Sequence, residues 1–374
     1  MRPIKMVDLL GQYHRIQPEV DQAMQQVLEA TDFIQGKAVG EFEASLSQYM
    51  NGCHVVSCGN GTDALQIAMM ALNFKPGDEI ILPVHTYVAT AEVIALLHLK
   101  PVFVDVEESS FTIDVSKIEK LINAKTVAIV PVHLYGQCAN LLPILEIAKR
   151  RKLYVIEDAA QSLGSDYLFS DGSRKKAGTL GIIGATSFFP SKNLGAFGDG
   201  GALFTSDETL AGKMRMIANH GQQKKYHHEV IGLNSRLDSL QAAILKVKLG
   251  YLEQYAQKRR EVAEYYDAHL RGLEFLKIPV RVSYSTHVFH QYTVRIEASR
   301  RDALKQYLQE KGIPTIIYYP IPLHLQKAYC KKEFEAGSFE VTERLSRTVL
   351  SLPVHTEMDE EQLSYICDSI QRFV

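Results

Sequence analysis

The chain has 374 residues, of which 46% are hydrophobic and 22% charged, so it is long enough to bury a large core and is not a disordered protein. Its formal net charge of −2 excludes a strongly basic surface for nucleic acid. No apolar run approaches the roughly 18 residues of a membrane span, and the N-terminal stretch lacks the apolar core of a signal peptide. Five cysteines without a CxxC pair are typical of a reducing compartment. We therefore expect a cytoplasmic protein without a nucleic-acid or membrane partner.

Strands and helices are predicted to alternate from residue 54 onward. Short apolar runs bounded by turn residues predict strands, and the stretches between them have helical spacing. The predicted strands are 54–57, 79–84, 101–106, 126–135 and 153–158, and the predicted helices are 62–73, 86–98, 114–123, 141–151 and 208–219. Apolar strands that alternate with helices indicate a mostly parallel sheet covered on both faces, so we predict an α/β fold.

The last third of the chain is predicted to form a second, smaller domain. Helical spacing continues from Ser235 to Leu270 without an intervening strand, which is typical of a connection between domains. The elements predicted beyond it are a strand at 288–297, a helix at 299–312 and a strand at 313–320. We therefore divide the chain into a large domain of residues 1–248 and a small C-terminal α+β domain of residues 249–374.

The first candidate site is the stretch SCGNGTDAL at 57–65, where a strand runs through a glycine turn into a helix that starts near Thr62. Ligands of open parallel sheets bind at the carboxyl ends of the strands. Exposed backbone N–H groups at the positive end of a helix are suited to a phosphate. A plain turn between strand and helix is the alternative.

The second candidate is VIEDAAQSLG at 155–164, an apolar strand that ends in two acids. A carboxylate at the end of a buried strand is costly unless it meets a cation, and a protonated pyridine nitrogen would be such a cation for Asp158. Gln161, three residues later, shares a face with Asp158 on an ensuing helical turn. The alternative is that Asp158 only caps a helix.

The third candidate is SFFPSKNLG at 187–195, which places Ser187 and Lys192 before the glycine-rich stretch GAFGDGG. A lysine whose pKa is lowered by confinement can condense with an aldehyde, whereas an ordinary surface lysine is the simpler reading of this stretch alone. Tyr87 could stack on a cofactor ring or be a core residue. A phosphate cradle, a buried acid and a reactive lysine are together what pyridoxal 5'-phosphate requires of a protein.

These three stretches and three others resemble the DegT/DnrJ/EryC1/StrS family of nucleotide-sugar aminotransferases. The resemblance covers nearly the whole chain and rests on six ordered motifs: NGTDAL, PVHTYVATAE, PVHLYGQ, IEDAAQSLG, SFFPSKNLGAFGDGGA and NSRLDSLQAAIL. It implies the aspartate aminotransferase fold, which is fold type I of the pyridoxal-phosphate-dependent transferases, and an enzyme that uses this cofactor.

The resemblance also implies roles for single residues. The implied cofactor-binding residues are Gly61, Thr62, Tyr87, Asp158, Gln161, Ser187, Lys192 and Asn234. Lys192 would bind the cofactor's aldehyde, and Asp158 would face the ring nitrogen. Gln161 would bond the ring hydroxyl, Tyr87 would stack on the ring, and the glycine, threonine and serine would bind the phosphate. Asn234 matches a residue that reaches the phosphate from a second subunit, which implies a homodimer with shared active sites.

The substrate is suggested by finer similarities. The sequence of the motif SFFPSKNLGAFGDGG resembles that of family members that aminate carbon 3 of the sugar. Residues 220–238 resemble the same stretch in enzymes that act on UDP-2-acetamido-2-deoxy-3-oxo-glucuronate with glutamate as amino donor. This resemblance implies a role in cell-surface polysaccharide biosynthesis. His228 and Arg236 are the predicted contacts for an anionic substrate, because a carboxylate requires a fixed cation. Tyr318 stands where similar enzymes carry His, and Tyr319 and His324 are predicted to line the pocket.

Several alternatives stay open. A dTDP-linked 3-keto-6-deoxyhexose would offer the same carbonyl, and a non-catalytic regulator could bind the same cofactor. Sugar dehydratases of the same fold use this cofactor but carry a His at the lysine position, so Lys192 argues against that class. A metal hydrolase built on His220, His227 and His228 is disfavoured because the three lack HExxH spacing, and we expect no metal.

Overall fold

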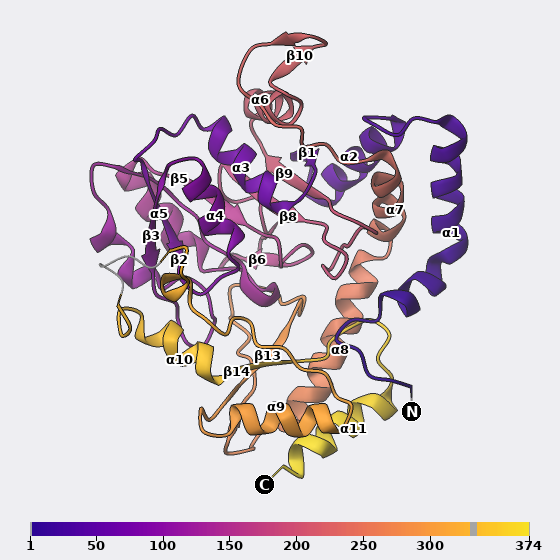
Figure 1. Ribbon diagram of the computed structural model, residues 1–374, viewed down its shortest axis with the longest axis vertical. Helices are drawn as coiled ribbons and strands as arrows, with labels where there is room; N and C mark the ends of the chain where they lie inside the picture. Colours follow the sequence, from indigo (N-terminus) through magenta and orange to yellow (C-terminus); the bar gives the residue numbers. More distant parts are fainter. Residues whose placement is uncertain (1, 330–334, 374) are drawn as a thin grey trace.

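The computed structural model describes residues 2–329 and 335–373, and a seven-stranded sheet lies at its centre (Figure 1). In spatial order its strands are β1 (His54–Cys58), β9 (Gly201–Thr205), β8 (Ile183–Ser187), β5 (Tyr154–Asp158), β4 (Thr126–Ile129), β2 (Glu79–Pro83) and β3 (Lys100–Val104). The five strands from β8 to β3 are parallel, whereas β9 runs antiparallel to both β8 and β1. The predicted α/β fold with a mostly parallel sheet is confirmed.

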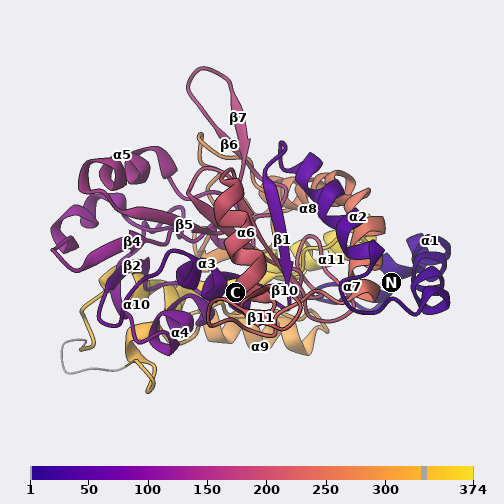
Figure 2. The same cartoon turned by 90° about the horizontal axis from the view of Figure 1, so that it is seen from above.

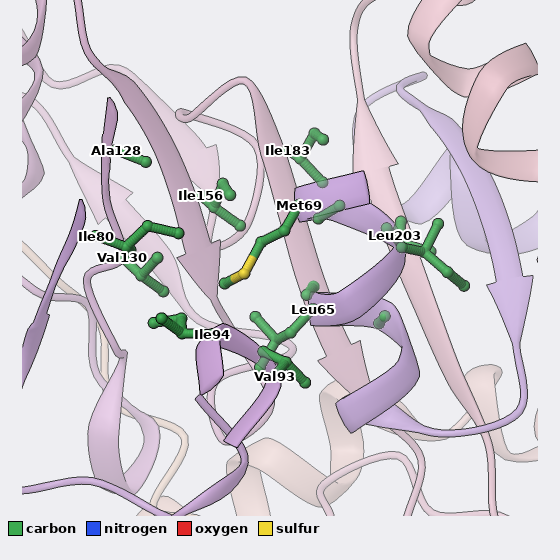
Figure 3. Packing of buried hydrophobic residues seen from close by; sticks show 14 of the residues in the cluster. Leu65, Met69, Ile80, Val93, Ile94, Ala128, Val130, Ile156, Ile183 and Leu203 are labelled. Atoms are coloured by element: carbon green, nitrogen blue, oxygen red, sulfur yellow. The ribbon is translucent and has the colours of Figure 1, made fainter. Parts of the chain in front are cut away.

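Helices cover both faces of this sheet. The covering helices are α3 (Gly61–Ala71), α4 (Ala89–Leu96), α5 (Leu141–Arg151) and α6 (Glu208–Ala218). Figure 3 shows Met69 of α3 packed among residues of one face, such as Ile80 and Ile156. Their neighbours in the strands, among them Ile81 and Val155, pack with α5 on the other face. Successive strand residues point to opposite faces, so strands buried on both sides have to be apolar throughout.

A second core lies below the large sheet in Figure 1, around a three-stranded antiparallel sheet. The elements of this part are α8 (Leu252–Leu270), β12 (Leu276–Lys277), β13 (Tyr292–Ile296), α9 (Arg301–Glu310), α10 (Glu340–Thr348), β14 (Val349–Leu352) and α11 (Glu360–Gln371). Leu252 packs in a core of the large unit, whereas Tyr266 of the same helix packs in the second core. Ile4 also packs in the second core, so the N-terminal segment lies with this unit. The division at residue 248 stays a prediction.

Three predicted elements differ from the structure. The strand predicted at 126–135 is shorter, because β4 ends at Ile129 and a 3-10 turn begins at Leu134. Residues 114–123 form two short 3-10 turns, η1 (Val115–Lys117) and η2 (Glu119–Leu121), instead of one α-helix. The predicted strand at 313–320 makes a single bridge, from Ile316 to Ser351. Pro314 and Pro320 bound this segment and have no N–H to donate to a ladder, which explains why no longer strand forms.

The remaining elements lie outside the two sheets already described. They are α1 (Leu9–Ala30), α2 (Lys37–Tyr49), α7 (Ser239–Leu249), the hairpin of β6 (Asp166–Leu168) and β7 (Arg174–Lys176), the hairpin of β10 (Gln222–Lys224) and β11 (His227–His228), and the short turns η3 (Leu134–Gly136) and η4 (Leu323–Leu325). The β10–β11 hairpin lies beyond α6 in Figure 1, and Figure 2 shows the β6–β7 hairpin projecting from another side. Among the described helices, none is both long and apolar enough to cross a membrane.

Candidate active site

The site is built where two neighbouring strands of the large sheet end. β5 ends at Asp158 and β8 ends at Ser187, and the two strands are adjacent and parallel, so both residues lie at the same edge of the sheet. Lys192 follows β8 in a tight loop. A Cβ at Gly195 would lie only 2.2 Å from the carbonyl oxygen of Pro190, so the loop that presents Lys192 requires glycine at this position.

Lys192 carries a partly buried amine beside this edge. Burial lowers the pKa of Lys192 from 10.5 to about 8, although the Asp158 carboxylate acts in the opposite direction. An appreciable share of the amine is therefore uncharged near neutral pH, as attack on an aldehyde requires. The reading of Lys192 as an ordinary surface lysine does not fit this environment.

Asp158 is buried, with 6% of its surface exposed. Thr90 Oγ1 donates to Asp158 Oδ2 at 2.7 Å, and the backbone N–H of Ala160 donates to Oδ1 at 3.2 Å. Both donors are neutral, so they orient the carboxylate without cancelling its charge. The edge of the sheet therefore holds a buried anion that is suited to a cationic ring nitrogen.

Gln161 and two tyrosines lie next to this acid. Gln161 Oε1 accepts a hydrogen bond from the backbone N–H of Tyr135 at 2.8 Å, and its Nε2 donates to the Tyr319 hydroxyl at 3.1 Å. The rings of Tyr319 and Tyr87 have centroids 6.2 Å apart. Tyr87 is 57% exposed, so it is not a core residue and its ring is free to stack on a flat ligand.

The predicted phosphate cradle lies at the start of α3. Asn60 caps the helix by accepting a hydrogen bond from the backbone N–H of Asp63 at 2.8 Å. A Cβ at Gly61 would lie 2.6 Å from Ser187 Cβ, so the helix start and the end of β8 are in direct contact. Gly61, Thr62 and Ser187 therefore meet at the positive end of a helix, which is an arrangement suited to a phosphate.

Replacing Gly61 with alanine is expected to weaken cofactor binding. The added methyl group would displace Ser187, and overpacking of this kind costs about 1–3 kcal/mol. We expect the Kd for pyridoxal phosphate to rise roughly tenfold or more in a fluorescence titration. Gly212→Ala in α6 is the matched control, since a Cβ there has no neighbour within 4 Å. If the two variants bound pyridoxal phosphate with equal affinity, the assignment of the start of α3 as the phosphate-binding site would be contradicted.

The NSRLD stretch adjoins this cradle within one chain. Ser235 Oγ donates to Asp63 Oδ2 at 2.6 Å and accepts from the backbone N–H of Gly59 at 3.0 Å. Asn234 is exposed. Arg236 lines a cavity of about 280 Å³ together with Arg215. The roles of Asn234 and Arg236 toward cofactor and substrate stay predictions.

His228 lies on the β10–β11 hairpin, exposed, with its Nδ1 2.8 Å from the carbonyl oxygen of His220. Its role in substrate binding also stays a prediction. The part of the chain that the structure describes contains no group of three His, Cys, Asp or Glu residues able to hold a metal ion.

The prediction that His324 lines the substrate pocket is wrong. Its side chain is fully buried, its Nε2 lies 3.1 Å from Glu343 Oε1, and its ring packs on Phe339 with centroids 4.7 Å apart. Glu343 also accepts hydrogen bonds from the backbone of Gly337, so the pair joins η4 to the start of α10. A side chain without exposed surface cannot contact a sugar.

Two residues of the site were not predicted. Thr90, which orients Asp158, lies within the PVHTYVATAE motif, and that position was the only available signal. Tyr135 supplies the backbone N–H that holds Gln161, and its hydroxyl donates to the carbonyl oxygen of Tyr318. Tyr135 likewise lies within the PVHLYGQ motif, but a backbone contact of this kind does not require a particular side chain, because any residue except proline can make it.

Comparisons with known proteins agree with this geometry. The sequence profile of the DegT/DnrJ/EryC1/StrS aminotransferase family matches residues 14–371. The chain is 44% identical over 372 residues to the pleiotropic regulatory protein of Geobacillus stearothermophilus, covering 99% of this chain and 98% of that protein. It is 43% identical over 371 residues to UDP-2-acetamido-2-deoxy-3-oxo-D-glucuronate aminotransferase of Pseudomonas aeruginosa, covering 98% and 99%.

Among solved structures, the crystal structure of S. venezuelae DesV in complex with a ketimine intermediate superposes on the chain with a TM-score of 0.95. The two are 38% identical, and the match covers 100% of each chain. The predicted fold type I is thereby confirmed. The chain belongs to the DegT/DnrJ/EryC1/StrS aminotransferase family, whose members are enzymes that use pyridoxal 5'-phosphate.

Proposed function

We propose that the protein transfers the amino group of glutamate to carbon 3 of a nucleotide-linked 3-keto sugar, namely UDP-2-acetamido-2-deoxy-3-oxo-glucuronate, in the synthesis of a cell-surface polysaccharide. The observation that carries the aminotransferase part is that a partly buried lysine and a buried carboxylate lie at the same edge of the sheet, close enough for the carboxylate to act on the pKa of the amine. The sugar is supported by the 43% identity to the Pseudomonas aeruginosa enzyme of that name.

The residues of the site fit the proposed chemistry. Bound pyridoxal phosphate supplies an aldehyde and an electron-withdrawing ring. Lys192 provides an amine that can be uncharged, so it can both attack a carbonyl carbon and carry a proton to or from a neighbouring carbon. Asp158, held by Thr90, would keep a proton on the ring nitrogen of the bound cofactor by offering it a buried negative charge.

We also propose a homodimer with shared active sites. Asn234 is exposed, Arg236 lines a small cavity, and His228 lies on a projecting hairpin, so each is placed to be reached by a second copy of the chain. In the dimer Asn234 would bind the cofactor's phosphate of the partner's site, and the two basic residues would contact the substrate's carboxylate.

An assay with two sugars tests the substrate. Glutamate and the purified enzyme are incubated separately with the UDP-linked 3-keto uronate and with a dTDP-linked 3-keto-6-deoxyhexose, and the product is identified by mass. We expect an amine from the uronate. An amine only from the dTDP sugar would favour that alternative, and an amine only from a 4-keto sugar would contradict the assignment to carbon 3.

A non-catalytic regulator is the second candidate, favoured by the name of the Geobacillus stearothermophilus relative. Lys192 and Asp158 would help to hold the cofactor in either kind of protein, but a protein that only binds the cofactor has no need of an amine that can also carry a proton near neutral pH. The presence of Lys192 and Asp158 together therefore supports catalysis. A purified protein that binds the cofactor and converts no keto sugar with glutamate would favour the regulator.

The reactivity of Lys192 in the cofactor-free protein is expected to depend on pH. Only the uncharged amine reacts with an aldehyde, so labelling by formaldehyde and cyanoborohydride should rise as the pH passes through about 8 and level off above it. A lysine in solution continues to gain reactivity up to about pH 10.4. Peptide mass spectrometry measures the labelled fraction, with N-acetyl-lysine amide as reference. A Lys192 profile that coincides with the reference would contradict the lowered pKa.

A further inference from the structure

Glu157, the neighbour of Asp158, is the centre of a second buried network. Its side chain is completely buried and, since strand residues alternate, lies on the opposite face of β5 from Asp158. Its Oε1 accepts from the backbone N–H groups of Leu180 and Gly181, both at 2.6 Å. Its Oε2 accepts from the N–H of Gly178 at 2.8 Å and lies 2.8 Å from His133 Nε2.

The tautomer of His133 follows from its own contacts. The backbone N–H of Ala139 donates to His133 Nδ1 at 3.1 Å, so Nδ1 carries no proton and the ring proton resides on Nε2, directed at Glu157. Burial by itself would raise the pKa of Glu157, but the hydrogen bonds from His133 and the backbone outweigh it, so the pKa lies below its ordinary value. Glu157 is therefore a carboxylate with four donors around it.

The loop that precedes β8 has to approach β5 closely to form this site. A Cβ at Gly181 would lie 2.5 Å from the carbonyl oxygen of Val155, and Gly178 has a φ of +90°. These glycines allow the loop before β8 to wrap its N–H groups around one carboxylate. The network therefore joins the ends of β4 and β5 to the loop that leads into β8.

The same network holds the residues that face the cofactor. The backbone N–H of His133 donates to the carbonyl oxygen of Asp158 at 3.0 Å, and the N–H of Asp158 donates to the carbonyl oxygen of Pro131 at 3.0 Å. The bond between His133 and Ala139 closes the loop that contains Tyr135, whose N–H holds Gln161. Asp158 and Gln161 thus both depend on the position of His133.

We propose that Glu157 and His133 are positioning residues for Asp158: their buried pair fixes the strand end so that the Asp158 carboxylate faces the ring nitrogen of the cofactor. This inference rests on the proposed function. Misplacement of a reacting group by 1 Å can lower a rate by about 10²-fold. Loss of the pair should therefore lower kcat and lower the pH at which the ring nitrogen of the cofactor is half protonated, while the KM for glutamate changes little.

Glu157→Gln is the first test. Each oxygen of Glu157 accepts two hydrogen bonds, so the amide nitrogen of glutamine has to face two donors in either orientation. We expect kcat to fall about tenfold or more and the midpoint for protonation of the ring nitrogen to fall by about one pH unit. Holoenzyme loaded with nitrogen-15 labelled pyridoxal phosphate reports that midpoint by NMR. Glu146→Gln, on the exposed side of α5, is the matched control.

A pair of substitutions at His133 separates positioning from simple loss of structure. His133→Asn keeps an acceptor near the Nδ1 position for Ala139 but removes the donor to Glu157, whereas His133→Gln keeps a donor near the Nε2 position and loses the acceptor. We expect the midpoint for protonation of the ring nitrogen, measured by nitrogen-15 NMR, to shift in His133→Asn and to remain near that of the wild type in His133→Gln. This pair also serves if Glu157→Gln fails to fold.

The results that overturn the inference are distinct from those that overturn the proposed function. Folded His133→Asn holoenzyme with the wild-type nitrogen-15 midpoint, or equal shifts in both His133 variants, would refute the positioning role. A lowered melting temperature with an unchanged midpoint would assign the network to stability alone and refute it too. A wild-type protein that aminates no keto sugar would instead refute the proposed function, and the NMR comparison requires only bound cofactor.

Discussion

Lys192→Ala is expected to lower kcat by at least about 10³-fold, because one amine provides both the attack on the carbonyl and the proton transfer. The pKa of Lys192, lowered to about 8, makes this amine the group able to act in both ways near neutral pH. The measurement is steady-state amination of the keto sugar with glutamate as donor. The variant should also fail to form a borohydride-stable bond with the cofactor at residue 192.

The control for this variant is Lys258→Ala. Lys258 is exposed on α8 and pairs with Glu261 at 3.1 Å, and a surface pair of this kind contributes about 0–1 kcal/mol. We expect its kcat to match that of the wild type. Turnover by Lys192→Ala within a few fold of the wild type, with the cofactor still attached covalently, would refute the assignment of Lys192.

Asp158→Asn is expected to lower kcat by about 10²–10³-fold, a typical loss when a preorganised electrostatic contact to the transition state is removed. Asparagine can keep the bond with Thr90 and nearly the same shape, so the change mainly removes a negative charge. Without that charge the ring nitrogen loses its proton more readily. We therefore expect kcat to fall while the thermal melting point of the cofactor-free protein changes little.

Two measurements together decide this prediction. Stopped-flow absorbance of the holoenzyme with glutamate gives the rate of the first half-reaction, and scanning calorimetry gives the melting point. Asp171→Asn, in the exposed turn between β6 and β7, is the matched control and should behave like the wild type. A half-reaction in Asp158→Asn as fast as in Asp171→Asn would mean that the ring nitrogen does not depend on this carboxylate.

Most of the fold was predictable from the sequence, and the structure brings the strand ends at Asp158 and Ser187 to one edge of the sheet, as the candidate site requires. Apolar strands bounded by turns revealed the parallel sheet, since strands buried on both faces have to be apolar throughout. Lys192 and Asp158 stand out as candidates only together with the phosphate cradle and the family resemblance, because each taken alone has a simpler reading, as a surface lysine and as a helix cap. The strand expected at 313–320 failed because this apolar stretch contains Pro314 and Pro320, which have no N–H to donate to a partner strand.

The α/β class of the fold follows from the sequence alone, and so do the candidates for a reactive lysine, a buried acid and a phosphate cradle, because each is encoded within a few consecutive residues. Which groups surround these candidates depends on the tertiary structure. It placed Thr90 on Asp158, gave Glu157 its ring of donors, and buried His324 against Glu343. These contacts join residues that are distant along the chain, and the packing of strands and helices, which no local pattern records, brings them within hydrogen-bonding distance.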